Sequence, residues 1–230
     1  MTIEIGGATR VVALLGHPVA HSLSPRMQNA AFAALGLDWA YVALDVPPAG
    51  LHDAVRGLAA LGFAGANVTA PHKLAVAKLV ETDEPSVNTL VLEGGRIVGH
   101  STDAAVLTGI DAERPVVVGD GGAATAFARA LPHARVFSRR GDWPPDVRGA
   151  DLVVHATPVH HGVLCELERG QTLVDLPYPT SATAEAARAA GARVVDGLDV
   201  LVAQGAAAFE LWTGLRAPVE VMRAAVRSGS

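Results

Sequence analysis

Three side chains that could act on a small polar ligand lie close together between Gly65 and Lys73, where the chain reads GANVTAPHK. Asn67 offers an amide, Thr69 a hydroxyl and Lys73 an amine. If the segment ends a parallel strand, alternation places Asn67 and Thr69 on the same side. Pro71 then ends the strand, and Lys73 begins the next helix near the same place. The pattern suits a hydroxylated or carboxylated ligand beside a titratable amine; a polar connection with a surface lysine is the alternative interpretation.

A second segment, GDGGAA at 119–124, has the pattern of a phosphate-binding turn. It follows a run of valines and precedes a predicted helix, which is the context that such turns need. Gly119 allows the tight turn, Gly121 lets the backbone approach a pyrophosphate, and Ala124 replaces the usual third glycine. A plain strand-to-helix turn is the alternative. The carboxylate of Asp120 would weaken the binding of any dinucleotide by charge repulsion.

Basic side chains follow at the end of the next predicted strand. NAD-binding domains usually carry an acidic residue about twenty positions after the glycine turn, where it binds the ribose 2′-hydroxyl. This chain has Ser138, Arg139 and Arg140 there instead. Because a guanidinium group can make paired hydrogen bonds to a phosphate, the pattern favours NADP over NAD.

The elements that must position these groups alternate between strands and helices, which predicts an α/β fold. The predicted strands are 10–15, 39–46, 63–69, 88–92, 96–98, 115–119, 134–138, 152–155, 172–176 and 192–195. The predicted helices are 24–35, 51–61, 74–80, 104–109, 121–131, 183–190, 198–214 and 218–226. Ser24 is the expected N-cap of the first helix, with Pro25 at its first position. Strand–helix units that repeat after a glycine turn describe a doubly wound, Rossmann-like dinucleotide fold.

Composition narrows the class of protein. The 230 residues carry a net charge of −5, which argues against a nucleic-acid-binding surface. No apolar run reaches the roughly 18 residues of a membrane span, and the start Met1–Glu4 does not resemble a signal peptide. Cys165 is the single cysteine, so an internal disulfide is excluded and a reactive role is not indicated. The nine histidines lack metal-ligand spacing, so no metal site is expected. A cytoplasmic protein is the simplest interpretation.

Taken together, these segments resemble the shikimate dehydrogenase family over roughly residues 11–216. The motifs occur in the order that the family has them: HSLSP at 21–25, NVTAPHK at 67–73, VNT at 87–89, STD at 101–103, the glycine turn at 119–124, SRR at 138–140, HAT at 155–157, Gly197, and the closing signature at 202–214.

The resemblance implies substrate-binding and catalytic roles. Ser22 and Ser24 are the hydroxyls expected to bind the substrate carboxylate. The expected partners of the ring hydroxyls and of the reacting oxygen are Asn67, Thr69, Asn88 and Gln204. Tyr178 is expected to place an aromatic hydroxyl near the substrate. Lys73 and Asp103 are the implied catalytic pair and also contact the substrate.

The resemblance also implies the reaction, the cofactor and the domain roles. The reaction is the reversible, NADPH-dependent reduction of 3-dehydroshikimate to shikimate, a step of chorismate and aromatic amino acid biosynthesis. The substrate-binding and catalytic domain is expected over 1–102, with a mixed, mainly parallel sheet. A compact Rossmann-like NADP domain follows over 103–196, and helices over 197–230 pack back on the first domain. A monomer or homodimer is expected. The expected cofactor-binding residues are Gly119, Gly121, Gly122, Ala123, Ser138, Arg139, Arg140, Ala156, Thr157, Leu176 and Gly197.

Some positions depart from the family pattern, mostly in the cofactor half. His155 stands where asparagine is usual, Arg140 where threonine is usual, and the stretch 140–151 is short, which leaves a loop over 141–145. Two alternatives therefore stay open beside a shikimate dehydrogenase. One is a quinate or aminoshikimate dehydrogenase, and the other is a non-catalytic shikimate-binding protein with a decayed cofactor site. His72 is interpreted as solvent-facing, and Phe209 and Trp212 as core residues.

Overall fold

The computed structural model describes residues 5–228, and the chain divides into two compact units. Unit 1 comprises Met1–Thr102 and Val202–Ser230, and unit 2 comprises Asp103–Leu201. Residues 1–4, on which the expectation of no signal peptide rests, lie outside the described residues. The substrate and cofactor roles expected for the two parts of the chain stay predictions.

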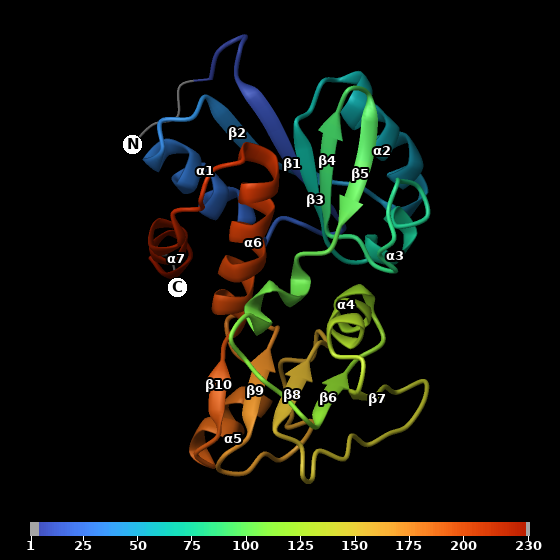
Figure 1. Cartoon of the computed structure of the whole chain (residues 1–230), viewed down its shortest axis with the longest axis vertical. Helices are drawn as coiled ribbons and strands as arrows, with labels where there is room; N and C mark the ends of the chain where they lie inside the picture. Colours follow the sequence, from blue (N-terminus) through green and yellow to red (C-terminus); the bar gives the residue numbers. More distant parts are fainter. Residues whose placement is uncertain (1–4, 229–230) are drawn as a thin grey trace. The chain divides into compact units, whose positions relative to one another are not determined.

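Unit 1 is built on a five-stranded mixed sheet with the order β2-β1-β3-β4-β5 (Figure 1). Its strands are β1 (Arg10–Gly16), β2 (Trp39–Asp45), β3 (Gly65–Val68), β4 (Thr89–Glu93) and β5 (Arg96–His100). β1 runs parallel to β2 and β3, whereas β4 runs antiparallel to β3 and β5. The β4–β5 hairpin turns at Gly94 and Gly95, whose positive φ angles of 57° and 80° suit a two-residue turn.

Helices cover both faces of this sheet. They are α1 (Ser24–Ala34), α2 (Leu51–Ala60), α3 (Lys73–Val76), α6 (Gly197–Thr213), which begins in unit 2, and α7 (Val219–Arg227), which lies against α1 (Figure 1). On one face, Val55 and Leu58 of α2 pack into the same core as Leu15. Phe32 of α1 and Phe209 of α6 are both fully buried, and their ring centroids lie 5.4 Å apart.

Unit 2 is a doubly wound parallel sheet with the order β10-β9-β8-β6-β7. Val117 of β6 shares a core with Phe127 of α4, while Val116 and Val118 pack on the other side with Ala184 of α5. This alternation along one buried strand is what a sheet covered on both faces requires. The strands are β6 (Pro115–Val118), β7 (Arg135–Phe137), β8 (Leu152–His155), β9 (Thr172–Asp175) and β10 (Arg193–Val195). The helices are the 3₁₀ helix η2 (Asp103–Leu107) and the α-helices α4 (Gly122–Ala130) and α5 (Ala182–Ala189).

The structure corrects two details of the expected elements in unit 1. The helix expected over 74–80 is the single turn α3, which ends at Val76. Ser24 is the first residue of α1 and makes no capping bond with its side chain. The hydroxyl of Ser22 instead accepts a hydrogen bond from the Ser24 N–H at 3.2 Å. Within residues 5–228, no helix has the length and hydropathy needed to cross a membrane.

Candidate active site

Asn67, at the carboxyl end of β3, is the centre of a buried polar network in unit 1. It is 4% exposed, and its Oδ1 atom accepts a hydrogen bond from the Tyr41 hydroxyl at 2.8 Å. Its Nδ2 atom donates to the Asn88 carbonyl and to Thr89 Oγ1, both at 3.1 Å. Tyr41 comes from β2 and Thr89 from β4, so this one amide links three strands of the sheet. The sequence reasoning missed Tyr41, whose one signal was its place in the strand predicted over 39–46.

Asn88 extends the network from the sheet to Thr102, in the connection that follows β5, and to Gln204 of α6. Its Oδ1 atom accepts from the Thr102 N–H at 2.7 Å, and its Nδ2 atom donates to Thr102 Oγ1 at 3.0 Å. Nδ2 also lies 3.4 Å from Gln204 Oε1. The structure therefore brings three of the predicted substrate-binding residues, Asn67, Asn88 and Gln204, into one hydrogen-bonded group.

Lys73 begins α3, and one hydrogen bond to its own carbonyl and another from the preceding side chain hold this turn. The Lys73 carbonyl accepts a hydrogen bond from Val87 N–H at 3.1 Å, just before Asn88. The preceding residue, His72, is only 2% exposed, and its Nε2 atom lies 2.7 Å from the Val46 carbonyl. Because a carbonyl oxygen can only accept, Nε2 carries a proton and donates it. The interpretation of His72 as solvent-facing was wrong: its imidazole anchors the turn that carries Lys73.

The remaining predicted substrate residues of unit 1 lie at two places. Thr69 follows β3, where its N–H donates to the Leu15 carbonyl at 2.8 Å. Its methyl group would lie 2.3 Å from a Cβ atom at Gly16, so a glycine there makes room for this side chain. Ser22 and Ser24 lie at the start of α1, where Ser24 is 6% exposed. The sequence reasoning placed Asn67 and Thr69 together, and the structure keeps both at the carboxyl end of β3.

Two of the predicted substrate residues belong to unit 2. Asp103 is the first residue of η2 and is 6% exposed. It follows Thr102 in the sequence, and Thr102 is the last residue of the network of unit 1. Tyr178 is half-buried in the connection that follows β9. The roles expected for both side chains stay predictions.

The glycine turn of unit 2 has the backbone shape that a phosphate group needs. Gly119 has a φ of +138°, and a Cβ atom there would lie 2.6 Å from the Ala156 carbonyl oxygen. Any side chain at Gly119 would therefore be strongly disfavoured. A Cβ atom at Gly121, just before α4, would meet nothing within 4 Å, which leaves its backbone open to a ligand. The turn joins the carboxyl end of β6 to a helix N-terminus, at the switch point of the sheet, and these features fit a dinucleotide pyrophosphate.

The two arginines after β7 are exposed, and each lies close to a different side chain. The Arg140 guanidinium lies 3.5 Å from the Asp120 carboxylate, and the Arg139 guanidinium lies 5.6 Å from the centre of the Trp143 ring. Asp120 thus forms an ion pair with one of the groups predicted to bind a 2′-phosphate. This pairing offsets part of the repulsion expected from Asp120, but it also engages Arg140.

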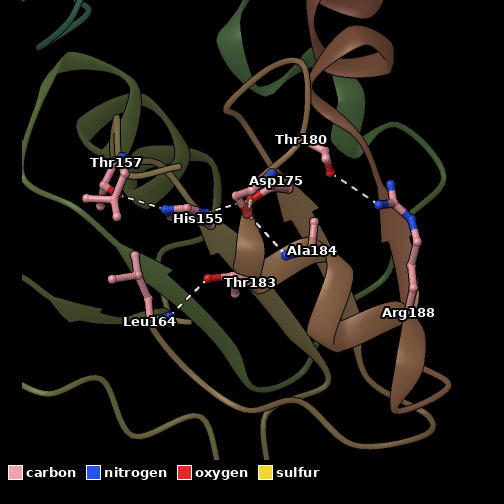
Figure 2. A network of polar contacts seen from close by, with 10 residues as sticks. His155, Thr157, Leu164, Asp175, Thr180, Thr183, Ala184 and Arg188 are labelled. Atoms are coloured by element: carbon pink, nitrogen blue, oxygen red, sulfur yellow. Dashed lines mark hydrogen bonds and ion pairs between the residues drawn. The ribbon is translucent and has the colours of Figure 1, made fainter. Parts of the chain in front are cut away.

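The other predicted cofactor residues follow the strands β8 and β9, as does a polar network (Figure 2). Ala156 and Thr157 come directly after β8, and the Thr157 hydroxyl lies 2.7 Å from His155 Nε2. Leu176 comes directly after β9. Gly197 begins α6, where a Cβ atom would lie 2.6 Å from the Leu176 carbonyl oxygen, so these two backbones approach closely. The sequence reasoning missed Asp175, although an acidic residue at the end of a buried strand was a signal for it.

Two observations concern clusters of metal-ligating side chains and the single thiol. Among residues 5–228, no group of three His, Cys, Asp or Glu side chains could hold a metal ion. Burial raises the pKa of the Cys165 thiol to about 11, and the negative charge of Asp175 adds to this shift. Because its thiol stays protonated at neutral pH, Cys165 is a core residue and not a nucleophile.

Comparison with known proteins identifies the family. A profile of the shikimate dehydrogenase substrate binding domain matches residues 14–90, and one of the shikimate 5′-dehydrogenase C-terminal domain matches residues 197–227. A curated protein of Moorella thermoacetica, named shikimate dehydrogenase (NADP(+)), is 39% identical over 282 aligned positions, which cover 98% of this chain and 95% of the relative. The chain belongs to the shikimate dehydrogenase family.

Solved structures extend this result to the fold. Shikimate dehydrogenase from Thermus thermophilus, in complex with NADP(H) and shikimate, is 33% identical with a TM-score of 0.83, and the match covers 95% of this chain and 98% of that one. Quinate dehydrogenase from Corynebacterium glutamicum, in complex with NAD, is 26% identical with a TM-score of 0.80, over 95% and 98% of the two chains. Family membership confirms both the resemblance seen in the motifs and the α/β fold class. The 282 aligned positions exceed the 230 residues of this chain, so the Moorella member of the family is considerably longer.

Proposed function

We propose that this chain is an NADP-dependent shikimate dehydrogenase, which reversibly reduces 3-dehydroshikimate to shikimate in the biosynthesis of chorismate and the aromatic amino acids. The observation that carries the proposal is the near full-length similarity to the curated NADP-dependent enzyme of Moorella. The two polar regions described above support it, because a ring with several hydroxyls needs convergent hydrogen-bonding side chains and a dinucleotide needs a glycine turn.

Lys73 is the proposed proton donor and acceptor. When bound, NADPH would supply the hydride for reduction, and NADP+ would accept it in the reverse direction. Reducing a ketone places negative charge on its oxygen, which the Lys73 ammonium stabilises and then protonates. The hydrogen bonds of the Lys73 carbonyl and of the adjacent His72 imidazole support this role, because a catalytic group must be held in place. Asp103 is the proposed second member of the pair.

Asn67 is better suited to positioning other groups than to binding substrate. Its two amide N–H groups both donate to protein oxygens at 3.1 Å, so it has no donor left for a ring hydroxyl, whereas Nδ2 of Asn88 makes a longer contact of 3.4 Å with Gln204 Oε1. We therefore assign direct substrate binding to the other predicted side chains. These are Ser22, Ser24, Thr69, Lys73, Asn88, Asp103, Tyr178 and Gln204.

Binding of NADP is proposed at the glycine turn and at the connections that follow β7, β8 and β9. The open backbone at Gly121 and the N-terminus of α4 suit the pyrophosphate, and Arg139 and Arg140 suit the 2′-phosphate. The remaining proposed residues are Gly119, Gly122, Ala123, Ser138, Ala156, Thr157, Leu176 and Gly197.

Two measurements test the proposal. We expect saturable binding of NADPH in a titration, and faster turnover of shikimate with NADP than of quinate or aminoshikimate with either NADP or NAD. A preference for quinate would support the alternative that this chain is a quinate dehydrogenase, as the Corynebacterium protein of the same fold is named. Ligand binding without any NADPH affinity would instead indicate a shikimate-binding protein and would contradict the proposal.

The proposed setting is the cytoplasm, with small-molecule ligands as partners, and the chain is expected to be a monomer or homodimer. Light scattering on the purified protein measures its mass directly. A larger assembly would contradict this expectation.

A further inference from the structure

His155 is a fully buried imidazole that connects the ends of two neighbouring strands in unit 2. It is the last residue of β8 and is 1% exposed. Its Nδ1 atom lies 2.6 Å from Oδ1 of Asp175, the last residue of β9, and its Nε2 atom lies 2.7 Å from the Thr157 hydroxyl (Figure 2). Both partners lie at the carboxyl edge of a parallel sheet, where such folds bind their ligands.

The surroundings of Asp175 determine which nitrogen of His155 carries a proton. Asp175 Oδ1 accepts a second hydrogen bond from the Ser181 hydroxyl at 2.8 Å, and Oδ2 accepts one from the Ser181 N–H at 3.3 Å. The same hydroxyl accepts from Ala184 N–H at 3.1 Å as the N-cap of α5, so its own proton must point to Asp175. A carboxylate that receives these bonds acts only as an acceptor. The proton between His155 and Asp175 therefore lies on Nδ1.

The protonation of Nδ1 has a consequence for Thr157. A second proton, on Nε2, would make the ring cationic and reverse this bond; in the neutral ring on which the proposal below rests, Nε2 is an acceptor and the Thr157 hydroxyl donates its proton to it. The Thr157 oxygen then keeps only acceptor positions, of which one faces the Val159 N–H at 3.3 Å. A threonine whose proton is committed in this way cannot donate a hydrogen bond to a phosphate oxygen.

We propose that His155 is a positioning residue that makes Thr157 a pure hydrogen-bond acceptor toward the dinucleotide. Thr157 then recognises a donor group of the cofactor, such as a ribose hydroxyl or the carboxamide NH2, rather than a phosphate. The inference rests on the proposed function, because it places NADP at this edge of the sheet. The close approach of the Ala156 backbone to the glycine turn at Gly119 supports that placement.

The first test reads the proton positions directly. We expect the ¹⁵N spectrum of the imidazole of His155 in the free protein to show a neutral ring with its proton on Nδ1. In Asp175→Asn, the amide oxygen should take the Oδ1 position, because the Ser181 hydroxyl donates to that atom, so the ring proton should stay on Nδ1. A charged ring, or a wild-type ring with its proton on Nε2, would overturn the proposal whether or not the protein binds NADPH.

The second test measures NADPH affinity by calorimetry. Thr157→Val removes the acceptor, and we expect the dissociation constant to rise about tenfold, the value of one well-placed hydrogen bond. Asp175→Asn, in which the amide oxygen still accepts from Nδ1, should change the affinity less than Thr157→Val does. Wild-type affinity in Thr157→Val would overturn the proposal.

Thr183→Val is the matched control. Thr183 is buried in the same unit and accepts a hydrogen bond from the Leu164 N–H at 3.0 Å, outside the group that links Asp175, His155 and Thr157 (Figure 2). Its substitution should lower the melting temperature and leave NADPH affinity unchanged. If the wild-type protein itself fails to bind NADPH, the proposed function fails, while the ¹⁵N spectrum still decides the state of His155.

Discussion

In unit 1 the predicted ligand-binding amides are buried and joined by hydrogen bonds, whereas in unit 2 the two arginines predicted to bind the 2′-phosphate are exposed. Asn67 and Asn88 are 4% and 2% exposed and share a network that includes Gln204. Arg139 and Arg140 lie on the surface, beside a stretch over 138–151 that forms neither helix nor strand. The shape of unit 1 is thus fixed by the protein itself, while parts of the cofactor region rely on flexible charged side chains.

This difference separates two kinds of specificity. Preorganised hydrogen-bonding groups discriminate strongly among ligands, because a ligand that lacks a matching group leaves a buried polar atom unpaired. Exposed arginines attract phosphate by charge, and solvent screens this attraction. We therefore expect substrate choice to be strict and cofactor choice to be graded. Four substitutions test this comparison.

Lys73→Ala should give the largest effect. Turnover should fall about 10³-fold because the proton donor is lost, while the affinity for shikimate stays close to that of the wild-type protein, since Asn88 and Gln204 remain in place. Lys78, an exposed lysine of the same region, provides the control as Lys78→Ala. Steady-state kinetics and shikimate titration measure both quantities. If Lys73→Ala keeps most of its turnover, Lys73 has no part in the mechanism.

Gly119→Ala should destabilise unit 2 by about 2–4 kcal/mol, because the added methyl group meets the Ala156 carbonyl in a backbone conformation that favours glycine. Gly121→Ala is the matched variant. Its methyl group meets nothing, so stability should stay within about 0.5 kcal/mol of the wild-type value, yet NADPH should bind more weakly because the methyl group obstructs the pyrophosphate. Urea unfolding and NADPH titration separate the two effects, and equal stability of both variants would contradict the expected geometry.

Asp120→Asn should tighten NADPH binding by roughly three- to tenfold. The change frees Arg140 from its ion pair and removes a negative charge from the phosphate turn. NADH lacks the 2′-phosphate and should gain less, so the preference for NADPH should increase. Asp142→Asn, an exposed change in the same region, serves as the control. Titrations at low and high salt measure this effect; unchanged affinity would show that Asp120 points away from the bound cofactor.

Asp151→Asn should have the smallest effect, a loss of about 0.5–1 kcal/mol of stability at pH 7. Partial burial opposes ionisation of Asp151, but hydrogen bonds from the backbone N–H groups of Glu113 and Arg114 outweigh it and hold its pKa below the usual range. A lowered pKa stabilises the folded state above the unfolded value of about 3.9, and this contribution is lost as the pH falls through the folded value. Unfolding curves of both proteins should therefore converge in acid. A difference that persists there would point to packing instead of charge.

The order of the elements could be predicted because turns and chain breaks are local. Gly94 and Gly95 indicate their hairpin, and every predicted strand has a counterpart within a few residues. The local sequence could not show that His72 is buried, because its partner, the Val46 carbonyl, comes from the end of another strand. Likewise, the motif around Asn67 predicted a polar residue facing a ligand, but the hydroxyl that occupies its oxygen belongs to Tyr41. The types of the site residues were readable from the sequence, while their bonding partners required the fold.

Of the three tryptophans of the chain, two belong to unit 1 and one belongs to unit 2. Trp39 and Trp212 are each 7% exposed in unit 1, and the Trp212 indole donates to the Leu90 carbonyl at 2.9 Å. Trp143 is the single tryptophan of unit 2, is 39% exposed, and lies beside Arg139. The protein thus carries an intrinsic fluorescent reporter for each half. Quenching of the red-shifted emission of Trp143 would follow a nucleotide arriving at Arg139, while the blue-shifted emission of the other two would report whether unit 1 stays folded.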